Sequence, residues 1–321
     1  MATTGIEQGK LMQIKVVMFL NQKNYFKPMP SRNSRNLKVF LPADLLRNIT
    51  TIEQKTLLLG DLSRYCAIYK VDEINIYNVP EDWKEKGFEL MLIEDVLNYQ
   101  MTPQYLRKHR FERRKTLSAA GLLHPLNTPN HPVEKESIGT LLDKDTVFYR
   151  QGIVTKIAGK EAQVDIGLEM PLEIRTKIQL KEGDQINVKI SRNEGRIEAI
   201  LVEEKNIPFY WGYVVNVLDT PLLDILKTLK LTDITIATSK YGKFFREIFD
   251  DKKIGAFSGK NSTSIFFGPR YKGLIQFFES RESFFASFDS VLNCVHEPGT
   301  KSVRLEEAFP ICLSFIDLLL S

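Results

Sequence analysis

Two patterns of apolar residues divide the chain. Over residues 37–146, and again from residue 209, apolar runs of strand length alternate with segments whose apolar residues recur at helical spacing. Residues 73–77 predict a strand, and residues 88–99 predict a helix with one apolar stripe. Helices and strands in alternation are typical of an α/β fold with a parallel sheet.

Further elements of this sheet are expected at short intervals. Strands are expected at residues 37–41, 210–218, 233–242 and from 264, with a helix at 221–229. Pro42 is expected to begin a helix that continues to residue 69, and Pro103 to begin another. An apolar run at residues 11–20 contains Gln13 and Lys15, so we interpret it as a strand and not as a signal peptide.

The pattern changes between residues 147 and 203, where short stretches of alternating apolar and polar residues are separated by glycine-containing turns. The expected strands are residues 149–158, 161–168, 172–178, 184–191 and 195–202. Five short strands at this spacing are typical of a small barrel of the OB type, a fold often used to bind oligonucleotides. An insert with a purely structural role fits the same pattern, and in either case the segment is a separate module.

Three of the predicted strands end in loops with small or polar residues. One loop ends the strand at residues 233–242, a second is bracketed by Gly268 and Gly273, and the third occupies residues 293–308. Because the carboxyl ends of parallel strands meet at one edge of a sheet, the three loops are expected to share a ligand pocket. An ordinary connection between a strand and a helix explains the third loop equally well.

A helix is expected after the third loop, with Ser302 as its N-cap. Pro310 counts against an unbroken helix there, since an internal proline costs about 3 kcal/mol. The glycine patterns of common nucleotide sites are absent, because no GxGxxG follows a predicted strand and Gly259–Lys260 lacks the earlier glycine of a P-loop.

Charge points to nucleic acid only locally. The 321 residues are 43% hydrophobic and 26% charged with a net charge of +4, a globular composition that does not require a nucleic-acid partner. One short run is strongly basic and interleaves with Tyr105 and Phe111, which is a feature of segments that contact nucleic acid. Its cations are Arg107, Lys108, Arg110, Arg113, Arg114 and Lys115. A solvated helix face is the alternative interpretation.

Cysteine and histidine content excludes several kinds of site. Cys66, Cys294 and Cys312 are an odd and scattered set, which favours a reducing, intracellular compartment over a disulfide framework. No C-x-x-C pair occurs, and His124 and His131 lack a third ligand, so no metal site is expected. The C-terminal apolar segment is shorter than the roughly 20 residues of a bilayer span, so no membrane association is expected.

Several longer motifs together resemble a known family. They are LSRYCAIYKVDEINIYN, TPQYLRK, AGLLHPLNTPNHP, YWGY, IATSKYG and NCVHEPGTKSVRLEEA. In order and position they are similar to the SPOUT-superfamily RNA methyltransferases with an inserted OB-like domain, the archaeal and eukaryotic family assigned to uridine N3 methylation of large-subunit ribosomal RNA. The resemblance implies a parallel α/β sheet with a C-terminal trefoil knot, S-adenosylmethionine as cofactor, ribosomal RNA as substrate, and a homodimer. It also implies a cytoplasmic location, or a nuclear or nucleolar one in a eukaryote.

The resemblance divides the chain into a basic N-terminal extension at residues 1–36, a methyltransferase domain at 37–146 and 206–321, and an OB-like inserted domain at 147–205. The cofactor residues it implies are Thr238, Tyr241, Gly268, Gly273, Asn293, Cys294, Gly299 and Thr300. Main-chain groups are expected to make most of the contacts to the cofactor. The basic run from Arg107 to Lys115 is expected to bind RNA together with the inserted domain.

The motif GDLSRYCA resembles a superfamily pattern that brings an arginine into the active site, which nominates Arg64. Its expected role is to bind substrate phosphate or to stabilise negative charge on the target base. Asp72 and Glu73 are candidates to orient Arg64 or to assist deprotonation. NCVHEPGT and GPRYKG depart from the family's usual loops, so a catalytically degenerate RNA-binding or ribosome-assembly factor with the same fold is the alternative function.

Overall fold

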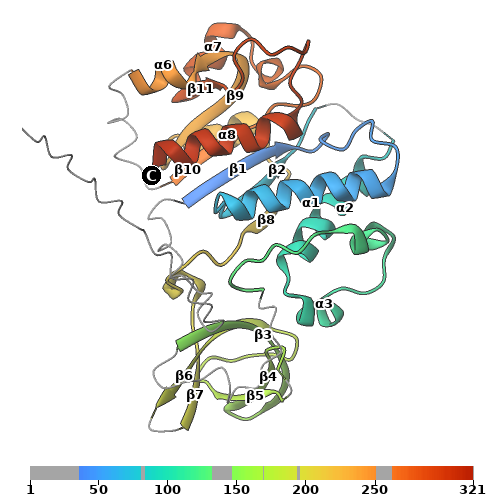
Figure 1. Ribbon diagram of the computed structural model, residues 1–321, viewed down its shortest axis with the longest axis vertical. Coiled ribbons are helices and arrows are strands. Elements are labelled where there is room, and N and C mark those ends of the chain that lie inside the picture. The colour runs from blue at the N-terminus through green and yellow to red at the C-terminus, as the bar shows by residue number, and fades with distance from the viewer. Residues whose placement is uncertain are drawn as a thin grey trace, which may run out of the picture. The chain divides into compact units, whose positions relative to one another are not determined.

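The computed structural model describes residues 36–80, 84–131, 147–168, 170–193, 196–250 and 262–320. These residues form a six-stranded sheet with helices and a second, five-stranded sheet from the middle of the chain (Figure 1). The strand expected at residues 11–20 and the N-terminal extension up to residue 35 lie outside the described residues.

The larger sheet is parallel throughout, in the order β11-β9-β10-β1-β2-β8. Its strands are β1 (Asn36–Pro42), β2 (Glu73–Tyr77), β8 (Val214–Leu218), β9 (Asp233–Phe244), β10 (Ser262–Phe266) and β11 (Ser290–Asn293). The α/β class and the parallel sheet predicted from the alternation of helix and strand are therefore confirmed. β8 is shorter than expected because residues 210–213 are not part of the strand.

The helices are α1 (Ile52–Ile68), α2 (Lys86–Met101), α3 (Gln104–Arg110), α5 (Leu222–Leu229), α6 (Phe245–Asp250), α7 (Arg281–Ala286) and α8 (Leu305–Leu320). Short 3-10 segments occur at Lys115–Leu117, Ala120–Leu122, Glu204–Asn206 and Leu274–Phe277. Across the described ranges, none of the helices combines the length and apolarity needed to cross a bilayer.

The start of α1 differs from the expectation. Pro42 ends β1 and the residues after it form turns, so the helix begins at Ile52. Thr51 caps it, because the Thr51 hydroxyl accepts a hydrogen bond from the Gln54 amide at 3.2 Å. A capping hydroxyl satisfies an amide that has no partner within the helix, which is why the helix begins there and not at the proline.

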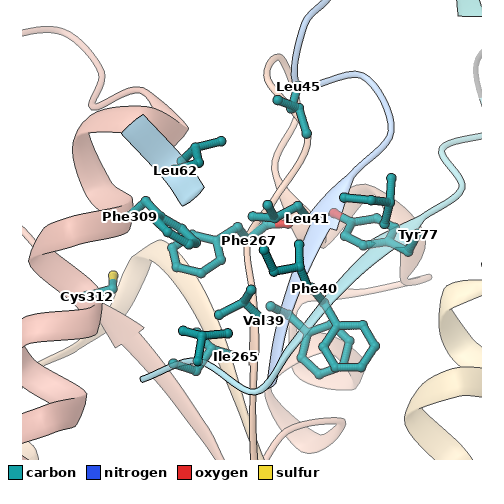
Figure 2. Packing of buried hydrophobic residues seen from close by; sticks show 14 of the residues in the cluster. Val39, Phe40, Leu41, Leu45, Leu62, Tyr77, Ile265, Phe267, Phe309 and Cys312 are labelled. Atoms are coloured by element: carbon teal, nitrogen blue, oxygen red, sulfur yellow. Dashed lines mark hydrogen bonds between the residues drawn. The ribbon is translucent and has the colours of Figure 1, made fainter. Parts of the chain in front are cut away.

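Helix α8 is continuous through Pro310, contrary to the expected break. The proline lies in the second turn, where it removes a single hydrogen bond to the preceding turn. Phe309 and Ile316 are buried on the face of α8 directed toward the sheet, and their burial offsets that loss. Figure 2 shows Phe309 directed toward Phe267, and the centroids of the two rings lie 4.8 Å apart. α8 also packs beside α1 (Figure 1).

The core of the larger sheet consists of apolar side chains from the central strands. Val39 of β1 lies opposite Ile265 of β10 in the parallel register, and neither side chain is exposed to solvent. Phe40 and Phe266 stack with centroids 4.2 Å apart. Strands buried on both faces read as continuous apolar runs, which explains why the Val39–Leu41 part of β1 was visible in the sequence.

The second sheet is antiparallel, in the order β5-β4-β3-β6-β7. Its strands are β3 (Val147–Ala158), β4 (Glu161–Asp165), β5 (Leu172–Arg175), β6 (Gln185–Asn193) and β7 (Arg196–Leu201), and they confirm the five short strands predicted in this part of the chain. β5 and β7 approach each other, so the sheet is nearly closed and barrel-like. It has its own apolar core, which includes Val154, Val164, Ile174, Val188 and Ile190.

Candidate functional site

The carboxyl end of β9 leaves the sheet and returns to it. β9 pairs with β11 in two places, with Ala237 opposite Val291 and then Lys243 opposite Leu292. Residues 238–242 lie between these pairings and bulge out of the ladder. The loop expected to end the strand is therefore an excursion within a longer strand.

A glycine closes this excursion against β11. A Cβ atom on Gly242 would lie 2.5 Å from the carbonyl oxygen of Val291 and 2.7 Å from its carbonyl carbon. No side chain larger than hydrogen fits at that distance, so the close approach of the two strands depends on glycine. Sequence reasoning did not single out Gly242, although a glycine at the end of a polar stretch is a signal of close backbone approach.

Two side chains join the three strand-end loops predicted from the sequence. The Thr238 hydroxyl donates to the Phe266 carbonyl at the end of β10, at 3.1 Å. The Asn293 side-chain amide donates to the Lys240 carbonyl at 3.2 Å. The structure thus brings the ends of β9, β10 and β11 together at one edge of the sheet.

The loop after β10 folds back on itself. A Cβ atom on Gly268 would lie 2.7 Å from the Leu274 amide nitrogen, and Gly273 has a positive φ of 67°. The Gly273 amide donates to the Pro269 carbonyl at 3.2 Å. Both bracketing glycines are therefore required by the backbone, and the loop presents main chain at the strand end.

The loop after β11 contains a disulfide that the sequence analysis did not predict. Cys294 bonds to Cys312 of α8, with the two Cα atoms 5.5 Å apart. The expectation of unpaired cysteines is wrong for this pair, while Cys66 is free and buried. The pairing results from α8 packing back against its own approach loop, which residue spacing does not reveal.

The remainder of this third loop is more exposed. Gly299 and Thr300 lie at the surface, and the Thr300 hydroxyl donates to the Ser302 carbonyl at 3.0 Å. Ser302 is not the N-cap, because α8 begins at Leu305 and the Glu307 carboxylate accepts from the Arg304 amide at 2.8 Å. This carboxylate caps the helix from its first turn, where the helix dipole favours negative charge.

Arg64 lies apart from the three loops. α1 begins at Ile52, on the side of the loop edge, and Arg64 comes 12 residues later. At a rise of about 1.5 Å per residue, Arg64 lies roughly 18 Å along the helix from that edge. Its guanidinium donates to the carbonyls of Pro125 and Leu126 at 3.0 and 2.7 Å. Arg64 thus holds the loop of residues 123–131 against α1.

Asp72 and Glu73 lie at the opposite edge of the sheet from the three loops, at the amino-terminal end of β2. The Asp72 carboxylate accepts from the Leu37 amide at 2.9 Å, and the Glu73 carboxylate accepts from the Asn36 side chain at 3.1 Å. Lys38 lies 4.0 Å from Glu73. Among the described residues of one chain, neither carboxylate hydrogen-bonds to Arg64, whose guanidinium donates to Pro125 and Leu126 instead.

The loop that Arg64 holds is also tied to α2. Gln100 donates to the His124 carbonyl at 3.0 Å, and His131 Nε2 lies 2.7 Å from the Met101 carbonyl oxygen. Burial lowers the pKa of His131 to about 4, so the ring is neutral at pH 7 and donates from Nε2. Within the part of the chain that the structure describes, Gln100 Oε1, Thr128 Oγ1 and Asn130 Oδ1 are buried here without a hydrogen-bond partner.

The basic run is only partly helical, since α3 ends at Arg110. Arg107 lies over the Tyr99 ring, 4.3 Å from its centroid, and donates to the Thr102 carbonyl at 3.0 Å. Arg114 forms an ion pair with Asp95 at 2.9 Å. Lys108 and Arg113 are exposed. Burial lowers the pKa of Arg107, which reflects how far this side chain is removed from solvent.

The other face of α3 contacts the barrel-like sheet. The Tyr105 hydroxyl donates to the Gln151 carbonyl at 2.5 Å, and its ring occupies the space above Gly167. Arg110 donates to the Gln185 side chain at 2.6 Å, and burial lowers its pKa. His109 Nε2 lies 3.1 Å from the Asp165 carboxylate. Beyond α3, Lys115 Nζ lies 5.4 Å from the centroid of the Phe88 ring of α2. Several cations of the run thus have structural contacts of their own.

Comparisons with known proteins identify related sequences. A family profile described as "Putative RNA methyltransferase" matches residues 36–316. An uncharacterized protein of Haloarcula marismortui is 28% identical over 302 residues, covering 87% of this chain and 98% of that protein. The human 28S rRNA (uridine-N(3))-methyltransferase is 30% identical over 224 residues, covering 64% of this chain and 58% of that protein. The mouse protein of the same name is 27% identical over 305 residues, covering 87% and 75%.

Proposed function

Because the chain belongs to the RNA methyltransferase family whose profile it matches, we propose that it transfers the methyl group of S-adenosylmethionine to N3 of a uridine in large-subunit ribosomal RNA. The human and mouse relatives are named for methylation at uridine N3 of 28S ribosomal RNA. An intracellular location at the site of ribosome assembly, cytoplasmic or nucleolar, follows from the same proposal.

The observation that carries the proposal is the meeting of three loops at the carboxyl edge of a parallel sheet. Thr238 joins the first loop to the end of β10, and Asn293 joins the first loop to the third. Ligands of parallel α/β sheets bind at this edge, where strand ends leave main-chain groups accessible.

S-adenosylmethionine supplies an electrophilic methyl group carried on a sulfonium. The residues proposed to hold it are Thr238, Tyr241, Gly268, Gly273, Asn293, Cys294, Gly299 and Thr300. The glycines let the loop after β10 fold tightly at the strand end, since a Cβ atom on Gly268 would meet the Leu274 amide nitrogen at 2.7 Å. Cys294 would contribute its backbone only, because its sulfur is bonded to Cys312.

The chemistry requires the uridine N3 to lose its proton while it is held at near-attack distance. Arg64 is the group we propose to stabilise negative charge on the base, with Asp72 and Glu73 as the carboxylates proposed to assist. In one chain Arg64 lies roughly 18 Å along α1 from the loop edge. We therefore propose a homodimer in which Arg64 of one copy faces the loops of the other.

Subunit mixing tests this arrangement. An Arg64→Ala chain and a Gly242→Val chain are each expected to be inactive alone, and the mixed dimer is expected to recover activity at one of its two sites. If Arg64 acts within its own chain, mixing restores nothing, because each chain then lacks one part of its own site.

We further propose the finer features that the family resemblance implies. The return of α8 past the loop after β11 would form a trefoil knot, and residues 147–205 would form an OB-like domain inserted between residues 37–146 and 206–321. RNA would contact this insert and the basic run Arg107, Lys108, Arg110, Arg113, Arg114 and Lys115. Arg110, Arg114 and Lys115 are also exposed but contact protein groups, so we propose Lys108 and Arg113 for contact with phosphate.

Calorimetry with S-adenosylmethionine is the decisive experiment. The expected result is saturable binding, followed by methyl transfer to a uridine-containing fragment of large-subunit ribosomal RNA. Absence of heat at millimolar cofactor, together with retained RNA binding, would favour the alternative, a catalytically degenerate RNA-binding or ribosome-assembly factor.

A further inference from the structure

Tyr241 is an exposed residue of the bulged segment of β9 (residues 238–242), and two cations lie over its ring. The Tyr241 side chain is 44% exposed. The Arg281 guanidinium carbon lies 4.7 Å from the centroid of its ring, and Lys240 Nζ lies 5.1 Å from the same centroid. Such contacts are favourable because the ring face is electron-rich, and they hold long, mobile side chains in place.

We call Lys240, Tyr241 and Arg281 the Tyr241 cluster. Hydrogen bonds and a second ring contact hold these residues in place. Asn293 holds the Lys240 carbonyl, and the Ser239 hydroxyl accepts from the Tyr241 amide at 3.3 Å. Arg281 is the first residue of α7, and its guanidinium carbon also lies 5.6 Å from the centroid of the Phe285 ring. The cluster therefore has a defined position beside the loop after β11.

The charge of the cluster is not neutralised by direct ion pairing. Among the described residues, no carboxylate lies within 4.0 Å of Lys240 Nζ or of the Arg281 guanidinium. Glu282 is the acidic neighbour, and its pKa is lowered first by its own backbone amide, then by Ser280, and to a smaller extent by Arg281. Two fixed cations on an exposed ring form a surface that suits an anionic ligand with flat groups.

We propose that the Tyr241 cluster is a contact site for single-stranded RNA beside the methyl-transfer loops. A base stacks on the tyrosine or on the arginine plane, and Lys240 and Arg281 contact the flanking phosphates. This inference rests on the proposed function, and it assigns the Tyr241 side chain to the RNA while leaving its main chain to the cofactor.

The site differs in kind from the basic run. Arg107 and Arg110 donate to protein groups, and Arg114 is paired with Asp95. The Tyr241 cluster combines exposure, an aromatic face and cations without a carboxylate partner. It also lies next to the proposed site of chemistry, where a strand must pass for its base to reach the methyl donor.

The test is a titration of the full chain with a fluorescent, unstructured, uridine-rich RNA oligonucleotide at several salt concentrations. Tyr241→Ala is expected to weaken binding by about fivefold to 150-fold, the range for loss of one stacked base, whereas Tyr241→Phe retains affinity. Replacing Lys240 and Arg281 by Gln is expected to reduce the slope of log affinity against log salt by about 0.7 for each cation. Lys227→Gln, an exposed lysine of α5 paired with Asp224, is the matched control.

Calorimetry with S-adenosylmethionine on the same variants separates the two proposals. Unchanged cofactor affinity in the variant with Lys240 and Arg281 replaced by Gln, together with weakened RNA binding, supports the inference. Unchanged RNA affinity overturns it, whether cofactor binding is retained or lost. Failure of the wild-type chain to bind the cofactor would count against the proposed function, while the RNA titrations still decide the role of the cluster.

Discussion

Cys294 in the loop after β11 is covalently bonded to Cys312 in the middle of α8, 18 residues later in the chain. The bond closes the proposed cofactor loop onto the C-terminal helix. Cys312 is fully buried and Cys294 is 9% exposed, so packing already brings the two side chains together.

Loss of this bond is expected to destabilise the fold. Cys312→Ser should lower the free energy of unfolding by about 3 kcal/mol, because a cross-link over a loop of this length restricts the unfolded chain. Urea unfolding without reductant measures the effect. Dithiothreitol should lower the wild-type midpoint and leave the variant unchanged, and a wild-type midpoint insensitive to reductant would contradict the prediction.

Gly242 permits the close approach of β9 and β11, so Gly242→Ala is expected to force the strands apart. The cost should be about 1–3 kcal/mol, the usual range for overpacking, with weakened S-adenosylmethionine binding. Gly87→Ala in α2 is the control, since a Cβ atom there meets nothing within 4 Å. Equal unfolding midpoints for the two variants would show that the strands tolerate a methyl group.

Arg64→Ala is expected to reduce methyl transfer by about 10²–10³-fold, the usual effect of removing one group that stabilises developing charge. Cofactor affinity should remain that of the wild type, because Arg64 lies away from the loops of its own chain. Single-turnover rates and calorimetry measure the two quantities. Wild-type turnover in Arg64→Ala would leave Arg64 with only its hydrogen bonds to the loop of residues 123–131.

Stability is expected to fall as the pH drops from about 6.5 to about 4. Burial lowers the pKa of His131 to about 4 in the folded chain, so below pH 6.5 the unfolded chain binds the additional proton. The contribution amounts to at most about 3 kcal/mol. His131→Gln retains an N–H donor for Met101 and should reduce this slope, measured by urea unfolding at several pH values. An identical slope in both proteins would contradict the assignment.

Local pattern was sufficient for much of the fold. The apolar runs of β1, β2 and β10, and the helical stripe of α2, follow directly from burial, because a buried face repeats with the period of its element. The glycines at 268 and 273 likewise marked a loop that the backbone requires. The prediction that Pro310 breaks the helix was wrong because helix propensity takes no account of burial. Phe309 packs against Phe267, and this contact stabilises α8 across the proline.

Contacts between distant segments decided the rest. The disulfide, the closure at Gly242, the ties of Arg64 to residues 125 and 126, and the two cations on Tyr241 all join parts of the chain far apart in sequence. The partners of a side chain depend on which segments pack together. The sequence of a basic run is the same whether its arginines face solvent or, like Arg107, lie over an aromatic ring. The sequence therefore specified the elements and the loops that carry chemistry, while tertiary packing determined which side chains in those loops are available to a ligand.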